Sequence, residues 1–339
     1  MNPAESSRPR RPLSPLVWLC LGLTALVLWN VVSNPAFLAV TLRDGHVYGV
    51  PIDIFTQASR TMLVALGMTL VIATGGVDLS VGSVVAIAGA VCALTLGHGA
   101  GLPLTIAAAI AVGAAAGAVN GLLVARLAIQ PIVATLILMV AGRGIAQLLS
   151  GGQVLIIADK SFEFLANGFV LGLPFAPLLV AALFLAAHLA LRRSALGLFI
   201  EAAGDNETAS RFAGLAAARI KWLVYVFSGA CAGLAGVLTA SNIRAADANR
   251  AGENAELDAI FAVVVGGTAL TGGRFSILGT FLGALLIQTL ATTMYYRGVP
   301  PAVAPVPKAL LIVAVSLLQS EKLRNRISAL WRKPRKVAA

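Results

Sequence analysis

The stretch ATGGVDLSVGSVVAIAGA, residues 73–90, places a polar interruption between two apolar runs. Its glycine pair, Gly75 and Gly76, breaks the preceding helix, because glycine is among the least helix-favouring residues. The carboxylate of Asp78 needs a partner in the protein interior or access to water, since a charge is costly inside hydrocarbon. We therefore predict a break between two membrane helices. Asp78 and Ser80 either cap the second helix, whose free N–H groups favour oxygen atoms, or contribute to a transport path.

Apolar runs of the same kind fill most of the chain. Of the 339 residues, 58% are hydrophobic and 12% charged, whereas a soluble domain carries about 25% charged residues. A membrane-spanning helix needs about 20 apolar residues. We predict an all-α polytopic membrane protein with about ten transmembrane helices, including broken or re-entrant segments, at residues 16–33, 54–74, 80–97, 103–125, 129–149, 172–191, 221–241, 259–271, 276–294 and 303–319.

The positively charged residues predict which span ends face the cytoplasm. With ten crossings and a cytoplasmic N-terminus, 17 of the 25 Lys and Arg residues fall in cytoplasmic segments and 5 in outer segments. Such an excess is typical of cytoplasmic loops, so it explains the net charge of +11 without a nucleic-acid partner. We expect basic cytoplasmic tails at residues 1–15 and 321–339, and a transmembrane domain at residues 16–320.

Motifs of catalysis are absent from the sequence. It contains no GxxxxGK[ST] phosphate loop, so the chain does not hydrolyse ATP through a P-loop of its own. It has no GxSxG or HExxH motif, and no acid–histidine relay runs through the spans as a proton pump would need. Three cysteines without a CxxC pair and three scattered histidines provide no metal cluster. We expect no catalytic residue, no metal and no cofactor.

A second interruption has the same pattern as the first. Residues 75–82 and 266–273 both fit GG-x-x-L-[S/T]-x-G, so Gly266 and Gly267 are expected to break a helix as the first pair does. Paired interruptions in two parts of a membrane chain point to transport sites between broken helices. A short match in a glycine-rich chain can also arise by chance, and the pattern alone does not separate the two explanations.

Other glycines are spaced for helix packing. They stand four residues apart on one helical face, at Gly113, Gly117 and Gly121, at Gly229 and Gly233, and at Gly279 and Gly283. Small residues let helix backbones approach closely in lipid. We assign these glycines to packing and not to a substrate site.

Polar residues within or beside spans are candidates to line a pathway: Asp78, Asn120, Gln130 and Gln288. On the outer side, one segment concentrates both charge signs beside a span end, at Arg244, Asp247, Asn249 and Arg250. This segment suits a rim that meets a soluble receptor or a polar solute, and solvation of a loop explains it equally well.

The long polar segment 192–221 lies on the predicted cytoplasmic side. It is expected to form short helices broken at Gly204 and Gly214. Its charged face is either solvated or a docking surface for a soluble partner.

Four stretches closely resemble the permease subunits of bacterial ATP-binding-cassette (ABC) sugar importers of the ribose/galactoside branch. They are residues 73–90, IQPIVATLILMVAGRGIAQLL (129–149), ALGLFIEAAGDNETASRFAGL (195–215) and GRFSILGTFLGALLIQ (273–288). The resemblance covers roughly residues 50–320. Within this branch, LRDGHVYGVPIDI (42–54) and NIRAADANRAGENAELDAIFAVVVGG (242–267) look most like the galactofuranose-type permease. The proline-rich stretch 300–307 departs from the pattern and leaves the start of the last span open.

The resemblance implies ABC importer permease architecture and a set of partners in the bacterial inner membrane. These are cytoplasmic ABC ATPase subunits, a periplasmic sugar-binding protein, and a second permease copy or a related permease chain. The stretch that matches the ATPase-coupling region holds Glu201, Gly204, Asp205, Asn206 and Gly214. The receptor would deliver sugar to the outer rim, and both termini would be cytoplasmic.

Two other functions compete with import driven by a partner ATPase. A stand-alone secondary carrier would couple sugar to an ion gradient, but ionisable residues deep in the spans are scarce. A membrane anchor that docks a soluble complex through residues 192–221 would need neither ten spans nor two broken helices. The leading expectation is therefore a monosaccharide permease, with galactofuranose-like or ribose-like substrates.

Overall fold

The computed structural model describes residues 15–300, 303 and 305–319. Apart from residue 15, the two predicted basic tails lie outside these residues, as does part of the proline-rich stretch 300–307.

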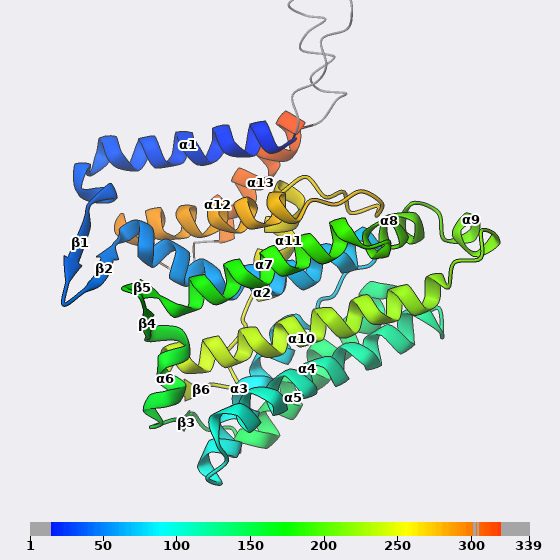
Figure 1. Ribbon diagram of the computed structural model, residues 1–339, viewed down its shortest axis with the longest axis horizontal. Coiled ribbons are helices and arrows are strands. Elements are labelled where there is room, and N and C mark those ends of the chain that lie inside the picture. The colour runs from blue at the N-terminus through cyan, green and yellow to red at the C-terminus, as the bar shows by residue number, and fades with distance from the viewer. Residues whose placement is uncertain (1–14, 301–302, 304, 320–339) are drawn as a thin grey trace, which may run out of the picture.

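The described chain is almost entirely helical (Figure 1). Its helices are α1 (Pro15–Ser33), α2 (Val50–Ala73), α3 (Val81–Gly97), α4 (Leu102–Ala125), α5 (Pro131–Ser150), α6 (Lys160–Asn167), α7 (Phe175–Arg193), α8 (Leu196–Asp205), α9 (Glu207–Phe212), α10 (Ala217–Ile243), α11 (Ala255–Val265), α12 (Ile277–Tyr296) and α13 (Pro305–Gln319), with a 3-10 helix at Pro35–Leu38.

Short antiparallel strand pairs lie at one end of the helical bundle (Figure 1). The strands are β1 (Val40–Arg43), β2 (His46–Gly49), β3 (Leu155–Ile156), β4 (Phe169–Val170), β5 (Leu173–Pro174) and β6 (Ala245–Ala246). β1 pairs with β2, β3 with β6, and β4 with β5. The opposite end of the bundle carries α8 and α9 (Figure 1).

The predicted spans all correspond to helices, but they differ in length. Seven described helices are long and apolar enough to cross a membrane: α1, α2, α4, α5, α7, α10 and α12. α3 has 17 residues, α13 has 15 and α11 has 11, so all three are shorter than the roughly 20 residues of a full span. The span predicted at 259–271 is therefore wrong at its end. The helix stops at Val265, because Gly266 and Gly267 follow it and no helix resumes before Ile277.

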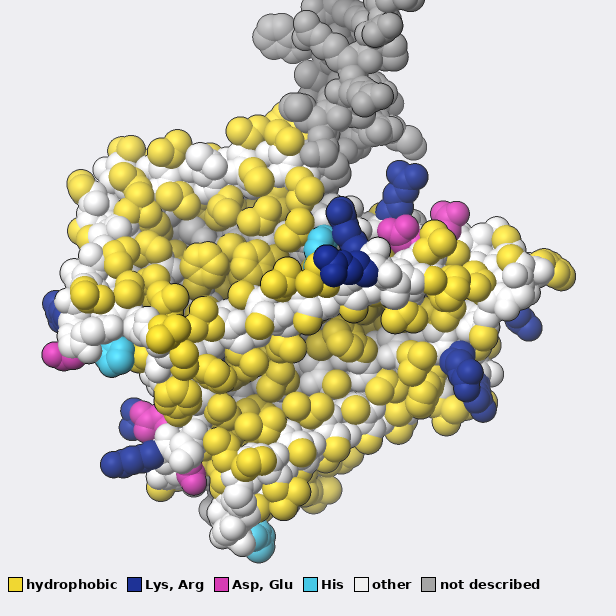
Figure 2. All heavy atoms as spheres, viewed as in Figure 1, with side chains coloured by type: hydrophobic (Ala, Val, Ile, Leu, Met, Phe, Trp, Pro, Cys, Tyr) yellow, Lys and Arg dark blue, Asp and Glu magenta, His cyan; other side chains and the backbone are white. Residues whose placement is uncertain are grey.

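The surface has the distribution expected of a multi-pass membrane protein. In Figure 2, hydrophobic side chains cover the face of the bundle in view, while charged side chains gather towards its two ends. The outer faces of α4 and α5 expose large apolar residues such as Leu104, Val140 and Leu148. Lipid tails solvate such faces, so the apolar band between the charged ends is the part that the bilayer surrounds.

Glycine contacts hold the centre of the bundle together. On α4, Gly113 and Gly117 lie against backbone atoms of α10, and Gly229 of α10 lies in turn against Gly113. Gly283 of α12 contacts the backbone of Ala262 in α11. A side chain at these glycines would overlap the neighbouring helix, which confirms their predicted role in close packing.

The helices α3 and α11 begin next to each other inside the bundle. Gly252, just before α11, lies against the carbonyl of Gly82 in the first turn of α3. The carboxylate of Glu256 also lies close to Gly82. α3 then runs towards β6 and α6, whereas α11 runs towards the start of α12. The N-termini of α3 and α11 therefore meet at depth in the protein.

Candidate functional site

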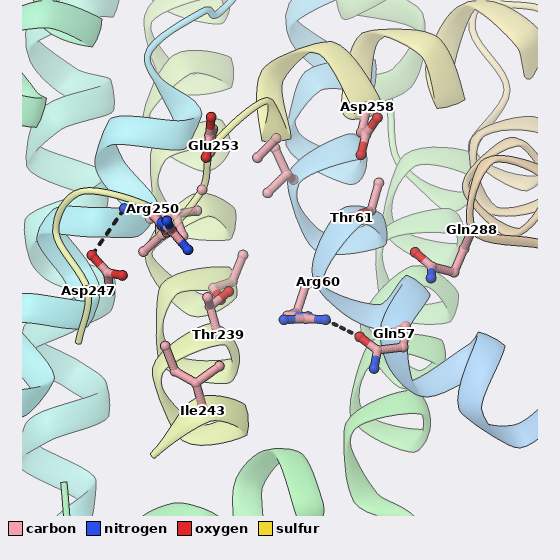
Figure 3. A pocket seen from close by; sticks show the side chains of 16 residues that line it. Gln57, Arg60, Thr61, Thr239, Ile243, Asp247, Arg250, Glu253, Asp258 and Gln288 are labelled. Carbon is pink, nitrogen blue, oxygen red and sulfur yellow. Dashed lines mark hydrogen bonds between the residues drawn. The ribbon is translucent and has the colours of Figure 1, made fainter. Parts of the chain in front are cut away.

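A polar cavity of about 450 Å³ lies beside the start of α11. Its walls come from α2, α3, α10, α11, α12 and the loop that connects β6 to α11. The polar side chains from the helices are Gln57, Arg60, Thr61, Thr239, Asp258 and Gln288 (Figure 3). Its volume falls within the range of about 300–1,000 Å³ typical of small-molecule sites.

Arg60 is the charged residue that α2 contributes to this cavity. The guanidinium donates a hydrogen bond to Oε1 of Gln57, one turn earlier on the same helix (Figure 3). Among the described residues, this is its one hydrogen-bond partner, and it forms no ion pair. The remaining N–H donors are therefore available to water or to a solute.

Two of the three acidic residues that line the cavity, Asp247 and Asp258, have partners among the described residues. Both carboxylate oxygens of Asp258 accept hydrogen bonds from Lys308 of α13, at 2.7 and 2.8 Å. Oδ1 of Asp247 accepts hydrogen bonds from the backbone N–H groups of Asn249 and Arg250 within its own loop. Positive and negative groups thus lie together in the cavity, an environment that suits a neutral polar solute.

The loop between β6 and α11 is held in place from α5. Arg143 donates hydrogen bonds to the carbonyl oxygens of Ala248 and Ala251, at 2.9 and 2.8 Å. One turn further along α5, Nε2 of Gln147 donates to Oδ1 of Asn249 at 2.8 Å. An arginine inside a span needs such partners. Here it satisfies carbonyls of irregular backbone and so fixes one wall of the cavity.

Asp78 lies in a separate, fully buried cluster between α3, α4 and α10. Its Oδ1 accepts hydrogen bonds from the hydroxyl and N–H of Ser80, at 2.7 and 3.1 Å, and a longer one from Asn120 at 3.4 Å. Its Oδ2 accepts from the hydroxyl of Ser228 at 3.1 Å. Nδ2 of Asn120 also donates to the hydroxyl of Ser80 at 2.8 Å. The cluster ties the turn before α3 to two neighbouring helices.

The two glycine breaks meet each other at the α8 end of the bundle. The N–H of Gly273 donates to the carbonyl of Ala73, the last residue of α2, at 2.9 Å. Gly204 of α8 lies against the same carbonyl, and the carbonyl of Gly204 lies close to Gly272. Gly272 also contacts the backbone of Gly75, and both have positive φ, at 89° and 77°. We call the contact of Gly75, Gly204 and Gly272 the glycine junction.

The predicted coupling segment differs from expectation at one break. Gly204 lies within α8, and the helices are separated instead at Asn206, whose Oδ1 accepts a hydrogen bond from the N–H of Ala209 and caps α9. Gly204 is the next-to-last residue of α8, and its lack of a side chain lets α8 contact the carbonyl of Ala73 at the end of α2. Gly214 follows α9 with a φ of 84°, as a helix-ending glycine does. Asp205 lies beside Gly273.

The remaining predicted residues are distributed over both ends of the bundle. Gln130 lines a groove between the α4–α5 connection and α9, and Glu201 lines another beside the start of α12. Arg244 ends α10 and forms an ion pair of 2.6 Å with Glu163 of α6. Of the pathway candidates, Gln288 lines the cavity, whereas Asp78 and Asn120 belong to the buried cluster.

Sequence reasoning missed Gln57, Arg60 and Arg143 as site residues. Both arginines fall inside predicted spans, and that position was the available signal, because an ionisable residue in a span marks function or an internal partner. The partners of Arg143 are backbone carbonyls more than 100 residues away in the chain, which no local pattern indicates.

Comparisons with known proteins place the chain among transport permeases. Residues 50–316 match the family described as branched-chain amino acid transport system / permease component. The chain is 48% identical to the galactofuranose transporter permease protein YtfT of Escherichia coli strain K12, over 90% of each chain.

Two further relatives are named for other sugars. The chain is 37% identical to the fructose import permease protein FruF of Bifidobacterium longum, over 94% of this chain and 92% of that one. It is 38% identical to the ribose import permease protein RbsC of Escherichia coli strain K12, over 80% and 85%. No solved structure matches the chain. The family match and these relatives show that the chain belongs to the family of transport-system permease components.

Proposed function

We infer that the chain is the membrane permease of an ABC importer for a monosaccharide. The observation that carries this inference is the extended similarity to permeases named for galactofuranose, fructose and ribose, at 37–48% identity over most of each chain. The polar, nearly charge-balanced cavity supports a neutral polyhydroxy solute. The permease itself moves the solute and does not catalyse a reaction. A galactofuranose-like sugar is the favoured substrate, because the relative at 48% identity is named for it.

Energy for transport comes from a separate ATPase in this proposal. ATPases dock on the end of the bundle that carries α8 and α9, which is then cytoplasmic, together with both termini. The glycine junction connects α8 to the ends of both breaks through backbone contacts. A movement of α8 would therefore reach α2 and the segment before α12 without any long side chain between them. The cavity lies at the C-terminal end of α10 and beside the β6–α11 loop, so in this proposal it opens towards the side where the sugar-binding protein docks.

The assembly contains partners that this chain does not supply. A periplasmic sugar-binding protein delivers the sugar to the rim formed by Arg244, Asp247, Asn249 and Arg250. A second permease, either another copy or a related chain, completes the pathway in the bacterial inner membrane. The exposed apolar faces of α4 and α5 are available for lipid or for that second permease.

Mass spectrometry of the proteins that co-purify with the tagged chain tests the assembly. The chain is extracted from its native membrane in mild detergent, and the captured binding protein is titrated calorimetrically with D-galactose, D-ribose, D-fructose and L-leucine. We expect a P-loop ATPase and a periplasmic protein that binds a sugar. L-Leucine binding would instead favour the branched-chain amino acid function named in the family description. Recovery of the chain alone, able to pass sugar by itself in liposomes, would favour a secondary carrier.

A further inference from the structure

The α2 wall of the cavity presents an arginine with unused donors. A guanidinium carries five N–H donors, and among the described residues Arg60 has a hydrogen bond to Gln57 alone. Figure 3 shows the guanidinium of Arg60 between α2 and α10, with Gln57 on the side of Arg60 that faces away from α10. An arginine in a membrane span is costly unless it is paired or faces a wet cavity. The open donors of Arg60 are thus directed at whatever occupies this cavity.

Neutral hydrogen-bonding groups surround the same space. Gln288 of α12 and Thr239 of α10 line the cavity with Arg60 and Gln57 (Figure 3). Amides and hydroxyls supply both donors and acceptors, while the guanidinium supplies donors only. A sugar hydroxyl both donates and accepts, so a ring with several hydroxyls matches this mixture of groups.

The charges of the cavity disfavour an ionic solute. Arg60 and Arg250 line it together with Asp247, Glu253 and Asp258, and Asp258 is paired with Lys308. With the lysine included, three positive groups face three negative groups. A charged solute would therefore gain little net attraction, whereas a neutral polyhydroxy solute is not repelled by either sign.

We propose that Arg60, Gln57 and Gln288 form a transit site for one monosaccharide inside this chain, with the guanidinium of Arg60 donating to two neighbouring ring hydroxyls. The proposal rests on the proposed function and adds to it the residues that contact the sugar. The cavity, of about 450 Å³, has the size of a small-molecule site. A site with few contacts holds the sugar briefly, as passage requires, since a tight site would trap it.

Uptake measurements on the complete transporter test the role of Arg60. The assembled complex is reconstituted in proteoliposomes, and radiolabelled D-galactose and D-ribose taken up per ATP hydrolysed are compared for Arg60→Ala, Arg60→Lys and Arg43→Ala. Arg43 is an exposed arginine of the β1–β2 hairpin, away from the cavity, and serves as the matched control. We expect Arg60→Ala to lower uptake per ATP at least about tenfold, Arg60→Lys to retain an intermediate value, and Arg43→Ala to match the unmodified chain. Hydrogen bonds to a charged group justify this size of effect.

Labelling of the cavity provides a second readout that leaves Arg60 in place. Thr61→Cys is introduced together with Cys20→Ser, which removes the exposed natural thiol. The rate of reaction with a charged methanethiosulfonate is measured in the assembled complex, with and without the sugar-loaded binding protein. We expect sugar to slow labelling at least about threefold.

The outcomes separate the two claims. If the unmodified complex moves no sugar, the proposed function fails and the transit site fails with it. If the unmodified complex moves sugar while Arg60→Ala moves as much per ATP, the transit site alone is overturned. If Arg60→Ala does not assemble, labelling decides: protection by sugar supports the site, and an unchanged rate overturns it.

Discussion

Asp78 is a fully buried carboxylate whose partners are all neutral. Its oxygens accept hydrogen bonds from Ser80, Asn120 and Ser228, which lie on three different segments. Each buried group that loses its partner costs about 1–3 kcal/mol. At the residue scale, this cluster therefore has a structural role: it holds the turn between α2 and α3 against α4 and α10.

Replacement of Asp78 tests this structural role. Asp78→Ala should lower the free energy of unfolding by several times the cost of one lost hydrogen bond, and Asp78→Asn by less, because the amide still accepts one of the donors. Thermal unfolding in detergent measures both. Asp53→Ala, at an exposed carboxylate in the first turn of α2, is the control and should change the unfolding temperature little. Equal unfolding temperatures for Asp78→Ala and the unmodified chain would show that the hydrogen bonds of Asp78 do not stabilise the fold.

Arg143 holds the β6–α11 loop through two carbonyl oxygens. Its removal should free this loop, because no other donor from α5 reaches those carbonyls among the described contacts. We predict that Ala248→Cys, buried at 2% exposure, reacts with a thiol reagent at least about tenfold faster when Arg143 is also replaced by alanine.

The neighbouring variant Gly144→Ala is the matched control for Arg143→Ala. A methyl group at Gly144 would contact nothing within 4 Å, so the loop should stay as closed as in the unmodified chain. Arg143→Lys should give an intermediate rate, since one ammonium can still reach a carbonyl. A labelling rate that is independent of residue 143 would show that the loop is held by other contacts.

At the element scale, helix positions followed from the sequence more closely than helix lengths. Hydropathy located α1, α2, α4, α5, α7, α10 and α12 to within a few residues. It placed a span over 259–271, where α11 ends at Val265, because apolar residues continue past the helix-breaking glycine pair. Periodicity also did not indicate the short strands, which have only two to four residues each, and β3 pairs with β6 about 90 residues away in the chain.

The candidate site was predictable only in part. Gln288, Asp247 and Arg250 could be selected because they are polar beside spans, and all three line the cavity. Asp78 and Asn120 met the same criterion, yet they lie in the buried cluster, where both bond to the hydroxyl of Ser80. Polarity in a span indicates that a residue needs a partner, but the partner is set by tertiary packing.

Gly204 makes the contact through which α8 reaches the two breaks. A Cβ atom there would overlap the carbonyl of Ala73 and lie 2.8 Å from the backbone N of Gly273. Gly204→Ala should therefore force α8 away from the glycine junction, at a cost of about 1–3 kcal/mol, as overpacking does elsewhere. We expect ATP hydrolysis by the assembled complex to continue while sugar uptake per ATP falls at least about tenfold.

Gly97→Ala is the control for this coupling prediction. Gly97 ends α3 and lies apart from the glycine junction, and a methyl group added there would contact nothing within 4 Å. Uptake per ATP should be unchanged in this variant. If Gly204→Ala keeps the same ratio of sugar to ATP as the control, α8 does not transmit movement through the junction.

At the scale of the whole molecule, apolar sides and charged ends define how the bundle sits in a bilayer (Figure 2). The cavity and the glycine junction lie towards opposite ends of α2 and α10. α2 connects them directly, since Gln57 and Arg60 lie in its first half and Ala73 is its last residue. A movement of α8, which the proposed ATPase would contact, thus has a continuous helical path through α2 to the cavity wall.

Sugar uptake by the purified transporter most directly tests whether the chain imports sugar with energy from a partner ATPase. The chain, its co-purified ATPase and any second permease are reconstituted in proteoliposomes, and radiolabelled D-galactose uptake is measured with the sugar-binding protein. We predict accumulation that requires ATP and the binding protein, and that stops when a non-hydrolysable ATP analogue replaces ATP. Accumulation by this chain alone, driven by an ion gradient and indifferent to ATP, would contradict it.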